Sequence, residues 1–166
     1  MIALHDFNHL PHEKALALIH PCVALPDWAD ALVHGRPYAS RDELFSTAKS
    51  LMQNWDEAAL AQALSAHPRI GEKPAGSQAE AALSRQEQGA VNDRDADLAR
   101  ALREGNARYE ARFGRVFLIR AKGRSGEEIL QALRARLENS DAQEVRAALE
   151  QLREITLLRL EGAISE

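Results

Sequence analysis

Apolar residues recur at intervals of three and four along nearly the whole chain, the repeat of helices with one buried face. A typical stripe is Leu44, Ala48, Leu51, Met52 and Trp55. Helices are expected after Pro11, near Trp28–Val33, after Ser40, over about Glu57–Ala66, from Ser77 to about Gln88, after Asp93, after Ser125, and after Ser140 or Asp141. Short amphipathic helices joined by short loops indicate a helical bundle.

Helix start and stop signals support this division of the chain. A capping box, in which a serine and a glutamate three residues later satisfy each other's backbone N–H groups, is expected at three places: Ser40 and Glu43, Ser77 and Glu80, and Ser125 and Glu128. Gly114 is placed to end the helix that carries Leu98, Leu102, Tyr109 and Phe113.

One apolar run does not fit a helix. Val116–Ile119 resembles a strand, but an isolated strand has no partner to pair with, so an extended connector is predicted, followed by a turn at Lys122–Arg124. The expected fold is therefore all-α: a compact single domain over residues 1–166 with about seven or eight helices and one short extended connector.

Composition excludes several classes of protein. The chain has 166 residues, of which 45% are hydrophobic and 28% charged, and a net charge of −4, so a globular protein without a nucleic-acid footprint is expected. No apolar stretch is long enough to span a membrane, and the first residues lack the order of a signal peptide. Cys22 is the single cysteine, which favours a reducing compartment such as the cytoplasm.

The histidines near the N-terminus look at first like metal ligands. His5, His9 and His12 have helical spacing, but Pro11 interrupts the face that they would share. Because no cysteine or acidic partner completes a zinc set, no metal is expected, and this segment is interpreted as a polar N-terminal lead.

His67 is a stronger candidate for chemistry. It stands at the expected end of a helix, is followed by Pro68, and leads into a loop with two glycines. Imidazole titrates near neutrality and serves as a proton donor or acceptor in catalysis. The alternative is a histidine that only caps the helix.

Two further features have both a functional and a structural interpretation. Ser84, Glu87 and Gln88 share one helix face, which is either a polar wall of a site or a solvated surface. Arg159 falls on a row with Ala148, Leu152 and Ile155 that is otherwise apolar, so its partner is either an anionic ligand or an internal carboxylate.

Four segments at these places resemble the OHCU decarboxylase family, which acts on 2-oxo-4-hydroxy-4-carboxy-5-ureidoimidazoline in urate breakdown. The resemblance covers essentially the whole chain, in order. The segments are Ala66–Gly71, Ser84–Gln88, Phe117–Gly123 and Glu154–Leu160, with additional support from Phe7-Asn8 and the helix near Trp55.

The resemblance implies a role for each candidate residue. His67 and Glu87 match the catalytic pair, and Arg159 matches an arginine that meets the substrate. The positions that match substrate contacts are Pro68, Ser84, Arg85, Gln86, Gln88, Ile119, Arg120, Ala121, Lys122 and Gly123. The family implies no metal, no organic cofactor and a homodimer. Arg69 stands where many members have aspartate, which is interpreted as a bacterial variant.

Three other functions compete with this interpretation. A helical interaction module without catalysis would leave His67 as a cap. A metal-dependent hydrolase would lose its activity with a chelator. A related helical enzyme would act on a different ureido compound. The decarboxylase hypothesis requires that His67, Glu87 and Arg159 share one cavity.

Overall fold

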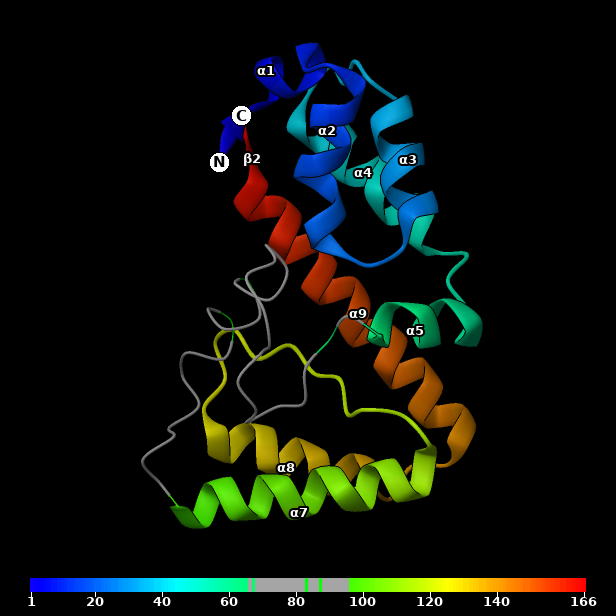
Figure 1. Ribbon diagram of the computed structural model, residues 1–166, viewed down its shortest axis with the longest axis vertical. Helices are drawn as coiled ribbons and strands as arrows, with labels where there is room; N and C mark the ends of the chain where they lie inside the picture. Colours follow the sequence, from blue (N-terminus) through cyan, green and yellow to red (C-terminus); the bar gives the residue numbers. More distant parts are fainter. Residues whose placement is uncertain (66, 68–82, 84–86, 88–95) are drawn as a thin grey trace. The chain divides into compact units, whose positions relative to one another are not determined.

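The computed structural model describes residues 1–65, 67, 83, 87 and 96–166, and these residues are mainly helical (Figure 1), so the predicted all-α class is confirmed. In chain order the elements are β1 (Ile2–Ala3), α1 (Leu4–His9), α2 (His12–Ile19), the 3₁₀-helix η1 (His20–Cys22), α3 (Pro26–His34), α4 (Arg41–Met52), α5 (Glu57–Leu64), α7 (Ala96–Phe113), α8 (Gly126–Arg136), α9 (Asp141–Ala163) and β2 (Ile164–Ser165).

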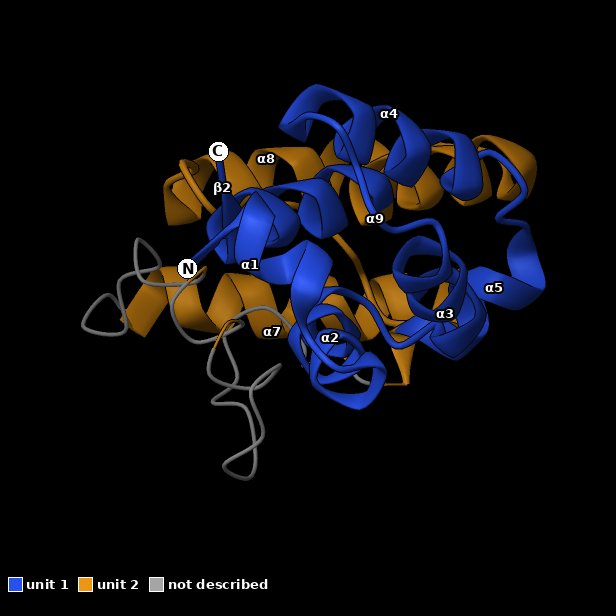
Figure 2. Cartoon of the chain, turned by 90° about the horizontal axis from the view of Figure 1, so that it is seen from above, with its two compact units in different colours: residues 1–63, 153–166 blue, residues 64–152 orange. Residues whose placement is uncertain are grey.

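The chain forms two compact units, coloured separately in Figure 2. Unit 1 comprises residues 1–63 and 153–166, and unit 2 comprises residues 64–152. The long helix α9 runs through the boundary, so that residues 141–152 belong to unit 2 and the rest of the helix to unit 1. The organisation of residues 1–166 as a single domain stays a prediction.

In unit 1, helix α3 packs against α2 and α4. The indole of Trp28 on α3 donates a hydrogen bond to the backbone oxygen of Ala48 on α4, at 3.2 Å, and its ring lies 6.1 Å from that of Trp55. Trp55 was expected on α4 itself; the helix ends at Met52, and Trp55 is buried just beyond it. Trp28 therefore links α3 to α4 and packs against Trp55, which follows α4 in the chain.

The N-terminal residues are folded into unit 1, and the prediction of a polar lead is wrong. Residues Leu4–His9 form α1, whose Leu4 and Phe7 are buried while His5 and His9 stay exposed. Strand β1 pairs in parallel with β2, with Ile2 opposite Ile164. This pairing joins the two ends of the chain, a contact that no local sequence pattern signals.

Unit 2 is built around the packing of α7 on α8. Their apolar faces and the segment between them form one buried cluster: Leu98, Leu102, Tyr109, Phe113, Phe117, Ile119, Ala121, Ile129 and Leu133. Gly105 permits the close approach, because a Cβ there would lie 2.5 Å from a methyl carbon of Leu133. The extended segment between the helices is thus part of the core.

The helix ends follow the predicted capping in part. The Ser125–Glu128 capping box is complete. At α4 only half of it forms: Ser40 accepts from the Glu43 amide, but the Glu43 carboxylate accepts from the amide of Ala39 instead of that of Ser40. The box expected at Ser77 and Glu80 lies outside the described residues.

Candidate active site

The extended connector between α7 and α8 carries five of the predicted substrate contacts, Ile119–Gly123. It begins at Gly114, whose φ of 71° ends α7, and turns at Gly123, whose φ is 83°. Positive φ favours glycine at both points, as the sequence predicts. Between them Ile119 and Ala121 are buried among the side chains of the unit 2 cluster. Their side chains are therefore part of the core, so the predicted substrate contacts of Ile119 and Ala121 would have to come from their backbone groups.

The turn of the connector is fixed by its own arginines. Arg120 donates from Nη1 to the backbone oxygen of Lys122 at 2.6 Å, and Arg124 donates from Nε to the backbone oxygen of Arg120 at 2.8 Å. The Arg124 amide also donates to the oxygen of Ala121, at 3.1 Å. These bonds hold residues 120–124 in one tight conformation.

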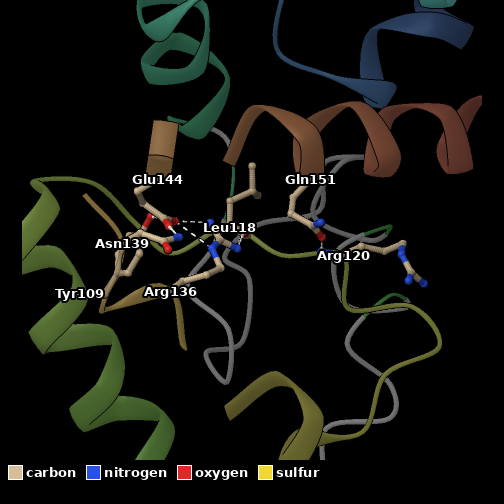
Figure 3. A network of polar contacts seen from close by, with 7 residues as sticks. All are labelled: Tyr109, Leu118, Arg120, Arg136, Asn139, Glu144 and Gln151. Carbon is tan, nitrogen blue, oxygen red and sulfur yellow. Dashed lines mark hydrogen bonds and ion pairs between the residues drawn. The ribbon is translucent and has the colours of Figure 1, made fainter. Parts of the chain in front are cut away.

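Side chains from α8 and α9 hold the middle of the connector (Figure 3). Arg136 on α8 donates from Nη1 to the backbone oxygen of Leu118, at 2.5 Å. Gln151 on α9 accepts the backbone N–H of Arg120 at its Oε1, at 2.9 Å. The two peptide groups on either side of Ile119 are therefore both anchored to helices of unit 2.

Arg136 is in turn held by a fully buried carboxylate. Glu144 on α9 forms a salt bridge with Arg136, whose Nε lies 2.8 Å from Oε1, and accepts further bonds from the Tyr109 hydroxyl at 2.5 Å and from Asn139 at 3.0 Å (Figure 3). Burial, and then the hydrogen bond to Glu144, raise the pKa of Tyr109 above its ordinary value. The network thus gathers Tyr109 from α7, Arg136 from α8 and Asn139 from the α8–α9 turn around the one carboxylate that α9 supplies.

Glu144 is not among the residues predicted from the sequence, although the sequence carries a signal for it. Glu144 lies four residues before Ala148 and therefore extends the apolar row of Ala148, Leu152 and Ile155. A charge on a buried row requires a partner. Applying to Glu144 the argument used for Arg159 would have identified it.

The predicted catalytic pair belongs to unit 2. His67 lies three residues beyond Leu64, the last residue of α5; it donates its backbone N–H to the oxygen of Leu64 at 3.1 Å and is half-buried. Its predicted position at a helix end is therefore confirmed. Glu87 is helical and half-buried. The predicted contacts Pro68, Ser84, Arg85, Gln86 and Gln88 lie outside the described residues.

Arg159 belongs to unit 1 and is buried with 5% of its surface exposed, as its place on an apolar row predicts. Its Nη1 donates to the backbone oxygens of Pro21 and Cys22, at 3.3 and 3.4 Å, where η1 ends. Backbone carbonyls are a kind of partner that the sequence analysis did not consider. A cavity shared by Arg159, His67 and Glu87 stays a prediction.

The N-terminal histidines take part in local contacts. The rings of His5 and His9 lie 4.4 Å apart on α1, and the His9 ring is hydrogen-bonded to the backbone oxygen of His5 at 2.7 Å. Among the residues that the structure describes, no group of three or more His, Cys, Asp or Glu side chains is arranged to hold a metal ion. None of the described helices has the length and apolar character needed to cross a membrane.

This chain is similar to known proteins over nearly its full length. Residues 8–161 match the model of the OHCU decarboxylase family. The 2-oxo-4-hydroxy-4-carboxy-5-ureidoimidazoline decarboxylase of Amia calva is 33% identical, over 97% of this chain and 94% of that protein. The enzyme of the same name from Haloferax volcanii is 29% identical, over 96% of this chain and 94% of that protein. 

The structural comparison points the same way. A crystal structure of OHCU decarboxylase in the presence of (S)-allantoin is 26% identical and superimposes with a TM-score of 0.72, covering 88% of this chain and 96% of that one. The sequence and the fold thus agree over nearly the full length, and the chain belongs to the OHCU decarboxylase family.

Proposed function

We propose that this chain decarboxylates 2-oxo-4-hydroxy-4-carboxy-5-ureidoimidazoline to (S)-allantoin in urate degradation, without a metal or organic cofactor. The observation that carries the proposal is the nearly full-length match to two relatives named for this reaction. The likeness to a structure obtained in the presence of (S)-allantoin supports the same product.

The chemistry explains why no cofactor is required. When the bond between the ring carbon and the carboxylate breaks, CO₂ leaves and the electron pair must be accepted elsewhere, a task that many decarboxylases assign to a cofactor ring. This substrate has a ring C=N beside the reacting carbon, which accepts the pair and gives an enol-type intermediate. Protonation of that intermediate on one face yields (S)-allantoin. The protein has to orient the ring, supply a proton and protect one face.

Each candidate residue has a part in this scheme. Glu87 hydrogen-bonds the substrate hydroxyl or a ring nitrogen and aligns the scissile bond, and His67 supplies or relays the proton. Arg159 and the backbone of Ile119–Gly123 hold carbonyl and ureido oxygens. Pro68 and the helix face that contains Glu87 complete the contacts.

The test is an assay that starts from urate with the upstream enzymes present and follows optical activity. Spontaneous decay gives racemic allantoin, whereas the enzyme gives one hand. His67→Ala should lower the rate by about 10²- to 10⁴-fold, the usual contribution of a general acid or base, and Glu87→Gln should also slow turnover.

His20→Ala is the matched control, because His20 also follows a helix and precedes a proline but is exposed. It should leave turnover unchanged. Near-normal turnover of His67→Ala rejects the catalytic assignment. A wild-type protein that yields only racemic product favours the helical interaction module, and loss of activity with a chelator favours a metal-dependent hydrolase.

We also propose that the enzyme acts in the cytoplasm and that it is a homodimer. Light scattering coupled to size-exclusion chromatography checks the second point: the expected mass is twice the 18.4 kDa of the chain. A mass of one chain at working concentration contradicts it.

A further inference from the structure

Two side chains that the catalytic scheme does not use bond to the peptide groups immediately before and after Ile119 and so fix the conformation of the connector there. Arg136 holds the backbone oxygen of Leu118, and Gln151 holds the backbone N–H of Arg120 (Figure 3). In an extended chain these two groups lie on the same edge. That edge of the connector is therefore occupied by the protein's own side chains.

The opposite edge follows from peptide geometry. A peptide unit is planar and carries its C=O and N–H on opposite sides. Since the Leu118 oxygen is turned toward Arg136, the N–H of Ile119 is turned away from it. Since the Arg120 N–H is turned toward Gln151, the oxygen of Ile119 is likewise turned away. Ile119 thus presents a donor and an acceptor on one edge, while its side chain is anchored in the unit 2 cluster.

We propose that Gln151 is a positioning residue for the decarboxylation: through the Arg120 amide it fixes the direction of the Ile119 backbone groups that the substrate meets. The inference rests on the proposed function, in which Ile119–Gly123 contact the substrate. Gln151 acts through the backbone and not on the reacting atoms. Arg136 shares the task, but its replacement also unpairs the buried Glu144, so Gln151 gives the cleaner test.

The experiment compares the steady-state kinetics of the full-length wild-type protein with those of three variants, and a fourth variant is kept in reserve. Gln151→Met removes the acceptor at nearly constant volume, and Gln151→Glu keeps an oxygen acceptor. Gln143→Met is the matched control: Gln143 also lies on α9 and also accepts a backbone N–H, that of Ser140 at 2.9 Å, but it serves the α8–α9 turn. Gln151→Asn, one methylene shorter, is a second loss variant if Gln151→Met does not fold.

Gln151→Met should raise KM about tenfold with kcat within about threefold of wild type, because it misplaces groups that bind the substrate before and during reaction. Gln151→Glu should restore most of kcat/KM, and Gln143→Met should match wild type. A merely structural role would lower the folded fraction and hence kcat, leaving KM unchanged.

Two results overturn the inference alone, given an active wild-type protein. One is equal kinetics for the loss variant and Gln143→Met; the other is a fall in kcat at constant KM that matches the loss of folded protein. If the wild-type protein produces no optically active allantoin, the proposed function fails and this inference fails with it.

Discussion

The two halves of α9 each bury a charge on the same row of the helix, but they hold it in different ways. Glu144 in unit 2 is fully buried, and Arg159 in unit 1 has 5% of its surface exposed. Glu144 is held by charged and polar side chains, Arg136, Tyr109 and Asn139. The contacts of Arg159 include the backbone oxygens of Pro21 and Cys22, at the end of η1.

A buried charge on an apolar row can serve either the packed structure or the binding of a ligand. The charge of the Glu144 carboxylate is compensated by Arg136 inside unit 2, and Arg136 in turn holds the connector. We therefore assign Glu144 a structural role. For Arg159 we propose a role in substrate binding. Substitutions at the two ends of the row should consequently affect different quantities.

The largest effect is expected at Glu144. Glu144→Gln leaves the Arg136 guanidinium, whose side chain is 11% exposed, without a compensating charge. Removing one partner of a buried pair costs about 3–5 kcal/mol of unfolding free energy. Denaturant unfolding measures it, with Glu150→Gln, an exposed carboxylate on the same helix, as the control. A loss of unfolding free energy below about 1 kcal/mol is the value typical of a surface ion pair. It would contradict the structural role that distinguishes Glu144 from Arg159.

Arg159→Lys should affect turnover more than stability. Lysine keeps the charge but not the planar fork that binds two oxygens, so kcat/KM should fall about a hundredfold. Arg153→Lys is the control, since Arg153 also lies on α9 and donates to a backbone oxygen, that of Met52 at 3.4 Å. If Arg159→Lys unfolds the protein as readily as Glu144→Gln while the remaining folded enzyme turns over normally, both ends of the row are structural.

A smaller effect concerns the pH dependence of the unfolding free energy, to which each unit contributes one buried tyrosine. The chain's two tyrosines, Tyr38 in unit 1 and Tyr109 in unit 2, are buried; burial raises the pKa of Tyr38 to about 12 and also raises the pKa of Tyr109 above its ordinary value. Above about pH 10 the unfolded chain releases these phenolic protons before the folded chain does, so stability falls as pH rises. Below that pH the two phenols contribute no slope.

Urea unfolding at about pH 9 and about pH 11 measures this slope. Tyr38→Phe should make the fall with pH shallower, because one of the two groups no longer titrates. Tyr109→Phe should do the same and should also lower stability at neutral pH, since its hydroxyl donates to the buried Glu144. An unchanged slope in both variants would mean that other groups dominate the alkaline loss.

Features that depend on neighbouring residues were predictable from the sequence. The Ser125–Glu128 box, the end of α7 at Gly114 and the turn at Gly123 all follow from local geometry, and all are present. The choice between Ser140 and Asp141 is settled by the reciprocal bonds between Ser140 and Gln143.

Features that join distant residues were not predictable. The pairing of Ile2 with Ile164 is too short to leave an alternating pattern, and nothing near Arg136 shows that it holds the oxygen of Leu118. The candidate site would need both kinds of information: the position of His67 just beyond α5 is local, whereas the proposed cavity shared with Arg159 depends on the tertiary fold.

A crystal structure of this protein with (S)-allantoin bound tests the central claim most directly. We expect one cavity in which the product contacts the His67 imidazole, the Glu87 carboxylate and the Arg159 guanidinium, with the Ile119 backbone along its edge. An imidazole of His67 in bulk solvent, with the product bound elsewhere or with Arg159 outside the cavity, would contradict it.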